Sequence, residues 1–172
     1  MTTTHPPLHR PEVAQQPGPA RVTPVARAMA ILRIALGFVF LWAFLDKTFG
    51  WHYSTATTPK SKAWIHGGSP TRGFLSHVEV GPLQSWYRSI AGHTWADWLF
   101  MLGLLGIGVA LLLGVAVRLA SAAGVLMLAF MWFAEFPPAQ HDRTGALTGS
   151  SNPLTDYHFI YALALLVIGL AV

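Results

Sequence analysis

The chain has 172 residues, of which 53% are hydrophobic and 10% are charged, and its formal net charge at pH 7 is +4. Soluble domains carry roughly 25% charged residues, so this composition excludes a protein that covers itself with polar surface in water. The absence of cysteine excludes disulfides, thiolate metal sites and redox chemistry through a cysteine pair. The sequence shows no basic patch that would indicate a nucleic-acid partner. In a membrane protein, an excess of Lys and Arg reflects first the topology and contacts with lipid headgroups.

The N-terminal residues 1–24 are rich in Pro, Thr and Gln and contain almost nothing that could form a core. This composition predicts a disordered tail. The remaining residues, 25–172, are long enough for one compact unit, which we expect to be a single membrane domain.

Four apolar runs follow the tail, at about residues 28–47, 95–114, 119–136 and 154–172. A helix of about 20 residues crosses a hydrocarbon core of about 30 Å, and in lipid only helices and closed barrels satisfy the backbone. These runs are too long and too continuous for barrel strands. The sequence therefore predicts an all-α integral membrane protein, a four-helix transmembrane bundle.

The connection between the first and second runs, residues 50–94, is too long for a structureless loop. Apolar residues at helical spacing after Pro82 predict a short helix lying in the membrane interface. Pro137 and Pro138 end the third helix. For the last helix, Asn152 is the expected cap and Pro153 suits the first turn.

Small residues recur four apart in the second run, at Gly106, Ala110 and Gly114. This spacing lets helices approach closely in lipid. We therefore expect this face to pack against another helix or against a partner protein.

Four antiparallel spans place most of the ionisable side chains at one end of the bundle. The members of this group are Asp46, Lys47, His52, His66, His77, His93, Glu135, His141, Asp142, Arg143, Asp156 and His158. The distribution of Lys and Arg favours a cytoplasmic N-terminus with the polar cluster outside, although the basic residues of the long loop argue for the reverse. We expect a multi-pass protein of a bacterial plasma membrane.

Three residues of the first helix are candidates for substrate binding or catalysis. Arg33 lies within the apolar run, where it either extends to the interface or pairs with an anionic group inside the bundle. Asp46 and Lys47 either simply mark the membrane boundary or have a functional role. If the helix face that carries Asp46 points inward, Asp46 accepts a hydrogen bond from a histidine or a substrate.

Three ionisable residues near the third and fourth helices are candidates for proton transfer. Glu135 ends the third helix in apolar surroundings, where it forms an ion pair with Arg143 or transfers protons to a bound ligand. Asp156 lies at the N-terminus of the fourth helix, where the helix dipole favours an acid, and this alone would explain an acidic residue there. His158 lies inside a span, either as a hydrogen-bonded structural group or as a functional partner of Glu135 and Asp46.

The eight histidines do not predict a metal or haem site. No H-E-x-x-H motif occurs, and haem held between two helices needs histidines inside two spans. The chain also has no G-x-G-x-x-G motif for a flavin or nicotinamide nucleotide. We expect neither metal nor haem.

Three segments together resemble a known family: RIALG to LDK at residues 33–47, KAWIHGGSPTRGFL at 62–75 and NPLTDYH at 152–158. With four spans, they look like the DoxX/DoxD family, and in particular like the DoxD-type subunit of thiosulfate:quinone oxidoreductase. The resemblance covers roughly residues 27–172, and the glycine-rich loop is its most specific part.

This resemblance implies a membrane oxidoreductase subunit with thiosulfate as donor and a quinone as acceptor. Thiosulfate would then favour the cations Lys47, Arg72 or Arg143 and the backbone of Gly67, Gly68 and Ser69. Glu135, Asp156 and His158 would relay protons to the quinone. The alternative hypothesis is a non-catalytic accessory or assembly subunit of a membrane complex. Membrane lipid, a second subunit and a homo-oligomer are the partners considered.

Overall fold

The computed structural model describes Met1, residues 23–58 and residues 61–172. Within these ranges the chain is helical, with no strand and one isolated β-bridge between His141 and Leu147. The predicted all-α class is therefore confirmed for the described residues. Nearly all of the expected tail, residues 1–24, lies outside these ranges, and its disorder stays a prediction.

The first long helix, α1, runs over Pro24–Phe49. Thr23 caps it by accepting a hydrogen bond from the N–H of Ala26, and the proline at the first position needs no helical partner for its missing N–H. Gly50 ends the helix at φ 71°, a left-handed conformation that costs glycine little. The 26 residues of α1 extend about 39 Å, more than a hydrocarbon core of about 30 Å.

Two further long helices form an antiparallel pair, α4 over Thr94–Leu113 and α5 over Val117–Glu135. Gly114, at φ 72°, ends α4 and begins a tight turn into α5. Phe136 ends α5 and is followed by Pro137, which cannot continue a helix. With α1, these are the three helices in the described residues that are long and apolar enough to cross a membrane.

The last helix, α6, spans Tyr157–Leu170 and packs along α5. It is shorter than the expected range of residues 154–172. Its 14 residues extend about 21 Å, less than a hydrocarbon core of about 30 Å. A fourth membrane crossing therefore stays a prediction.

The prediction that Asn152 caps the last helix and that Pro153 occupies its first turn is wrong. Asp156 is the cap, because its Oδ1 accepts a hydrogen bond from the N–H of Phe159 at 2.9 Å. Asn152 instead accepts two backbone hydrogen bonds within the turn that precedes α6. Both residues offer the same kind of capping oxygen, so the local sequence did not distinguish them.

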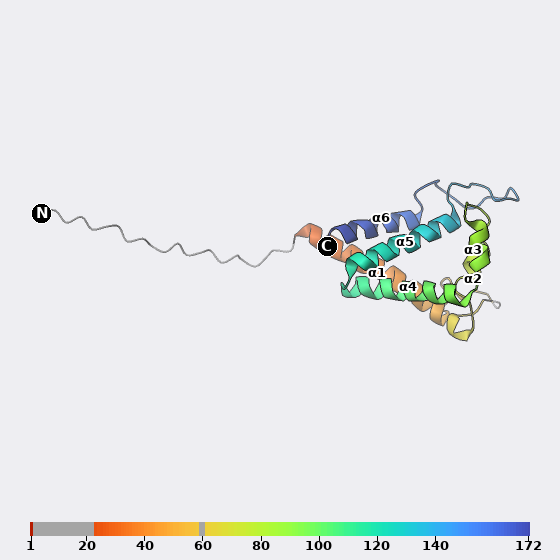
Figure 1. The fold of residues 1–172 in the computed structure, drawn as a ribbon, viewed down its shortest axis with the longest axis horizontal. Coiled ribbons are helices and arrows are strands. Elements are labelled where there is room, and N and C mark those ends of the chain that lie inside the picture. The colour runs from red at the N-terminus through yellow and green to blue at the C-terminus, as the bar shows by residue number, and fades with distance from the viewer. Residues whose placement is uncertain (2–22, 59–60) are drawn as a thin grey trace.

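The helices lie side by side in the order α1, α4, α5 and α6, and α6 returns to α1 (Figure 1). They enclose one apolar core, whose most buried members are Leu36, Phe40, Met101, Leu104, Ile107, Leu111, Leu165 and Ile168. Close approach of α1 and α4 depends on Gly108, since a Cβ there would lie 2.7 Å from the backbone nitrogen of Leu41. Gly106 is not part of this contact: a Cβ added to it meets nothing within 4 Å.

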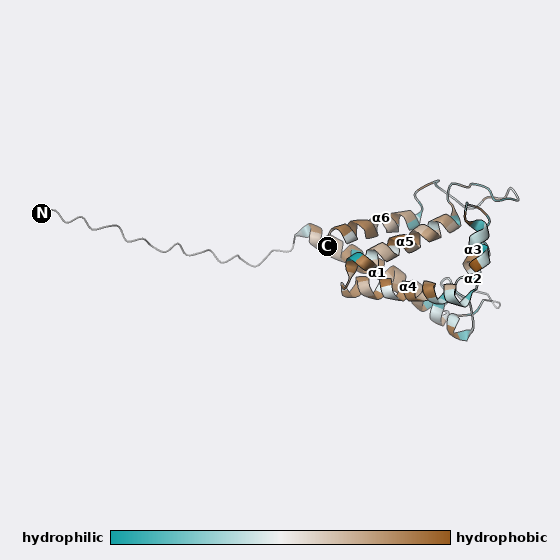
Figure 2. Cartoon of the chain, viewed as in Figure 1, coloured by the Kyte–Doolittle hydropathy of each residue, from teal (hydrophilic) through white to brown (hydrophobic). Residues whose placement is uncertain are grey.

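The outward faces of the long helices are apolar as well. Leu99, Leu102 and Leu113 of α4 are 67%, 55% and 72% exposed, and Figure 2 shows the hydrophobic colour along the bundle with hydrophilic residues gathered toward one end. Such a surface is costly in water and favourable in lipid. The fold therefore defines a helical membrane protein.

The segment between α1 and α4 folds over one end of the bundle. It contains the 3₁₀ helix η1 (Trp64–His66), the short helix α2 (Arg72–Leu75) and α3 (Gln84–Ile90). Figure 1 shows α3 lying across the ends of α4 and α5. The hydroxyl of Tyr87 holds it there by donating to the carbonyl of Phe130 at 2.6 Å.

Candidate functional site

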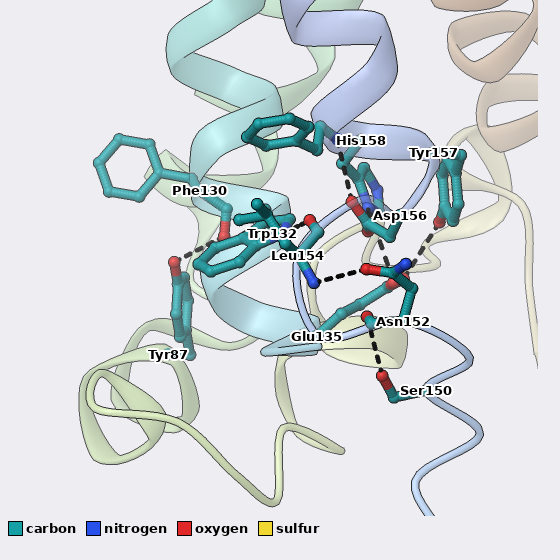
Figure 3. Close-up of polar contacts among 11 residues, drawn as sticks. Tyr87, Phe130, Trp132, Glu135, Ser150, Asn152, Leu154, Asp156, Tyr157 and His158 are labelled. Carbon is teal, nitrogen blue, oxygen red and sulfur yellow. Dashed lines mark hydrogen bonds and ion pairs between the residues drawn. The ribbon is translucent and has the colours of Figure 1, made fainter. Parts of the chain in front are cut away.

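Four polar side chains gather where α5 ends and α6 begins, as Figure 3 shows: Glu135, Asp156, Tyr157 and His158. Glu135 is the last residue of α5, Asp156 is the N-cap of α6, and the other two form the start of α6. The structure thus brings together three residues that the sequence analysis singled out. We call these four residues the acid–histidine cluster.

The contacts within the acid–histidine cluster join ionisable groups to one another. His158 Nδ1 lies 2.8 Å from Asp156 Oδ2 and 3.6 Å from Glu135 Oε2. Tyr157 donates its hydroxyl proton to Glu135 Oε1 at 3.1 Å. The expected pairing of Glu135 with Arg143 is wrong, because its partners are a tyrosine and a histidine.

His158 is the most enclosed member of the cluster. It is 1% exposed, and its Nε2 is a buried atom without a hydrogen-bond partner among the described residues. Burying an unpaired polar atom costs roughly 1–3 kcal/mol. A purely structural histidine would usually have both nitrogens satisfied, so this atom favours a functional role.

The cluster offers three ligand atoms, one each from Glu135, Asp156 and His158, within 4.8 Å of one another. This spacing could admit a small divalent cation. Two features weigh against it: Asp156 is already engaged by the N-terminus of α6, and the positive end of a helix disfavours a cation. The expectation of no metal stays a prediction.

A large cavity lies between α4 and α5, beneath the segment that joins α1 to α4. We call it the apolar cavity; its volume is about 1600 Å³, and the side chains along the two helices include Phe100, Ile107, Leu126, Met127, Phe130 and Met131. Its polar lining lies near the loops and includes Lys47, Ser69, Arg72, Glu135 and Tyr157. An apolar slot with a few polar groups at one end suits a ligand with an apolar body and a polar ring.

A second cavity, of about 700 Å³, lies among the loops on the other side of the cluster. We call it the acidic cavity, because Glu79, Glu135, Asp142 and Asp156 line it and His77 is its one histidine. A cavity with this charge repels anions. A dianionic substrate would therefore favour the apolar cavity, where Lys47 and Arg72 lie.

Sequence reasoning missed Asp97, which holds the glycine-rich loop to α4. Its Oδ1 accepts hydrogen bonds from the N–H and hydroxyl of Thr71 at 2.9 and 2.6 Å and from the hydroxyl of Ser69 at 2.9 Å. Asp97 is buried. The available signal was an acid in the first turn of an apolar helix, where it needs donors from elsewhere.

The predicted substrate-binding residues of the glycine-rich loop have structural roles in this arrangement. Gly67 ends η1 at φ 80°. Gly68 packs so closely that a Cβ would lie 1.9 Å from the carbonyl oxygen of Lys62. Ser69 donates to Asp97, so its hydroxyl is not a free donor for a ligand.

Asp46 also has a structural role. It is 1% exposed and accepts hydrogen bonds from the N–H groups of Tyr53 and Ser54 and from the hydroxyl of Ser54. Its carboxylate therefore fixes the chain that leaves α1. The neighbouring Lys47 is half-buried and lines the apolar cavity, where it remains a candidate ligand-binding group.

Two cations that the sequence suggested are not part of either cavity lining. Arg33 lies toward the opposite end of the bundle, where it donates to the carbonyl oxygens of Leu111 and Leu112 at the C-terminus of α4. This contact satisfies helix-end carbonyls and explains how the charge is tolerated. Arg143 is exposed in the loop between α5 and α6.

The fold and its polar end define a small helical membrane protein with a ligand-sized cavity. The model of the DoxX family matches residues 28–135, more than half of the chain, and the chain belongs to this family. No curated protein and no solved structure matches it. The matched region ends at Glu135, so family membership alone says nothing of Asp156, Tyr157 and His158.

Proposed function

We propose that this DoxX protein is a quinone-linked membrane oxidoreductase subunit that oxidises thiosulfate. The observation that carries the proposal is the apolar cavity, whose loop end combines Lys47, Glu135 and Tyr157. A quinone needs an apolar slot for its ring and tail and donors for its ring oxygens. Lys47 of α1 would supply one such donor and protonated Glu135 at the end of α5 the other, since the hydroxyl of Tyr157 already donates to Glu135.

The acid–histidine cluster would supply the protons. Coupling of two thiosulfates through a new S–S bond gives tetrathionate and releases two electrons, and the quinone takes up these electrons and two protons. Glu135 lines the cavity and contacts His158, which in turn contacts Asp156. The proton lost from Glu135 would be replaced through this contact.

The electron donor would bind where positive charge lines the apolar cavity. Lys47, Lys62 and Arg72 lie there, and thiosulfate is a small dianion. Neither the acidic cavity nor the exposed Arg143 offers such surroundings.

The test is thiosulfate-dependent reduction of decylubiquinone by the purified protein in proteoliposomes. Glu135→Gln and His158→Ala should each abolish most of the turnover. His66→Ala is the matched control, because His66 is exposed and lines neither cavity. Binding is measured separately by quenching of tryptophan fluorescence, since Trp64, Trp86 and Trp98 line the apolar cavity. A folded protein that neither binds nor reduces the quinone would overturn the proposal.

One observation favours the alternative, an accessory or assembly subunit. Gly106 lies on the exposed face of α4, and a Cβ added there would meet no atom within 4 Å, so this face has room for another protein. In that case Gly106→Leu should abolish co-purification of a partner, and Glu135→Gln and His158→Ala should not affect function. The quinone assay and the co-purification assay therefore separate the two functions.

A further inference from the structure

Glu135 and Tyr157 occupy a particular place between the two cavities. Of the described residues that line either cavity, four line both: Gly73, Phe74, Glu135 and Tyr157. Gly73 and Phe74 belong to α2, and neither carries an ionisable side chain. The hydrogen bond from Tyr157 to Glu135 thus lies in the wall that separates the acidic cavity from the apolar cavity.

Glu135 is the one carboxylate in this wall, and it has the exposure that a transfer group needs. Its side chain is 36% exposed, whereas His158 and Asp156 beside it are 1% and 15% exposed. Asp97, the other carboxylate lining the apolar cavity, is occupied by donors from Ser69 and Thr71. Glu135 alone combines access to both cavities with contacts to a hydroxyl and an imidazole.

The charges on the two sides of Glu135 differ in sign. Acids line the acidic cavity, and such surroundings attract protons; cations line the loop end of the apolar cavity. The titratable groups around Glu135 are Asp156, Tyr157 and His158 at the start of α6, His77 and Glu79 before α3, Asp142 after α5, Lys47 of α1 and Arg72 of α2.

We propose that Glu135 is the proton-transfer residue between these cavities: it takes protons from the aqueous phase on the loop side, through the acidic cavity, and delivers them into the apolar cavity. Tyr157 positions the Glu135 carboxylate in the wall. The inference rests on the proposed function for the identity of the proton acceptor, a quinone. It adds the side of the membrane from which the protons come and the route that they follow.

The test uses carbodiimides, which form an adduct with a protonated carboxyl group by adding it across one C=N bond. Dicyclohexylcarbodiimide partitions into bilayers and reaches the apolar cavity, whereas a quaternary-ammonium carbodiimide stays in water and reaches the acidic cavity. The full chain in sealed proteoliposomes is treated with each reagent, and adducts are located by mass spectrometry. Glu135→Gln confirms the assignment, and Glu79, which lines only the acidic cavity, is the internal control.

We expect Glu135 to react with both reagents and Glu79 to react chiefly with the water-soluble one. Labelling of Glu135 by a single reagent, or by neither while Glu79 reacts, would overturn the inference. The rate of labelling by dicyclohexylcarbodiimide should also fall when pH is raised on the loop side alone, because only the protonated acid reacts. A rate that follows the pH of the opposite side would contradict the proposed route.

Labelling in the presence of decylubiquinone in the bilayer tests the quinone site separately from the proton route. A quinone in the apolar cavity should slow labelling of Glu135 by dicyclohexylcarbodiimide and leave labelling by the water-soluble reagent unchanged. If the quinone slows labelling of Glu135 by neither reagent while both still react, Glu135 is accessible from both cavities but the apolar cavity does not bind the quinone. The proposed function would then be wrong and the present inference would not.

Discussion

Two groups of acids lie at the same end of the bundle and differ in their partners. Asp46 and Asp97 are buried, and each accepts three hydrogen bonds from backbone and hydroxyl donors that cannot titrate near neutral pH. Glu135 and Asp156 instead lie against the imidazole of His158, with Nδ1 to carboxylate distances of 3.6 and 2.8 Å. The first group holds loops in place, whereas the second joins ionisable side chains to one another, the arrangement on which the proposed proton transfer rests.

The substitution that tests this difference most directly is Glu135→Gln. It keeps the size of the side chain and an acceptor oxygen but removes the exchangeable carboxyl proton. We expect turnover with decylubiquinone to fall by roughly 10²–10⁴-fold, the usual contribution of a general acid or base. The thermal midpoint in detergent should change little, because the side chain is partly exposed. A loss of folded protein equal to the loss of activity would place Glu135 with the structural acids.

The reverse result is expected at Asp97. Asp97→Ala leaves the N–H and hydroxyl of Thr71 and the hydroxyl of Ser69 without their acceptor. We expect a loss of about 3 kcal/mol of unfolding free energy, since each buried unpaired donor costs roughly 1–3 kcal/mol and water can satisfy some of them. Thermal unfolding in detergent measures it.

Asp97→Asn is the matched control, because the amide keeps one acceptor oxygen. It should cost less than half as much as Asp97→Ala. Equal destabilisation by both variants would show that the charge, rather than the hydrogen bonds, holds the glycine-rich loop.

A third test asks how closely the glycine-rich loop is packed. Gly68→Ala should cost about 2 kcal/mol, because its Cβ would lie 1.9 Å from the carbonyl oxygen of Lys62 and overpacking of this kind costs about 1–3 kcal/mol. Gly73→Ala is the control, since a Cβ there meets nothing within 4 Å. Unfolding in detergent compares the two, and equal stability would show that the loop is not closely packed.

The sequence predicted the helical class and the three long membrane helices, because the length of an apolar run can be read directly from the sequence. It also predicted that ionisable groups gather at one end, because successive spans of a membrane protein run in opposite directions. It also selected Glu135, Asp156 and His158, and in the structure His158 Nδ1 lies within ion-pair distance of both acids. These three follow from chain order, since one ends a helix and the other two begin the next.

The sequence could not assign roles that depend on tertiary contacts. Asp46 and Asp97 are both acids near helix ends, and only the fold shows which donors reach them. The same is true of Arg33, whose partners come from the far end of α4, and of Asn152 and Asp156, which compete for one capping position. Tyr157 was missed because its hydrogen bond to Glu135 joins two helices and is visible only in the fold.

The smallest expected effect concerns the contact that fixes α3 across the bundle. Burial raises the pKa of Tyr87 to about 12, so the folded state holds this phenolic proton more tightly than the unfolded chain. The stabilising contribution is complete below pH about 10 and is lost as pH rises through about 12. Tyr87→Phe removes the hydrogen bond to Phe130 and should cost about 1 kcal/mol at neutral pH.

The pH dependence distinguishes this contact from general alkaline unfolding. The difference in unfolding free energy between the native chain and Tyr87→Phe should shrink between pH 10 and 12, because the tyrosine ionises there in the unfolded chain while burial keeps it protonated in the folded one. Tyr53→Phe is the control, because the side chain of Tyr53 is largely exposed and little unfolding free energy should depend on its hydroxyl. A difference at Tyr87 that stays constant up to pH 12 would mean that α3 is held by apolar packing alone. In that case the part of the apolar cavity lined by Trp86 and Tyr87 would keep its shape without this hydrogen bond.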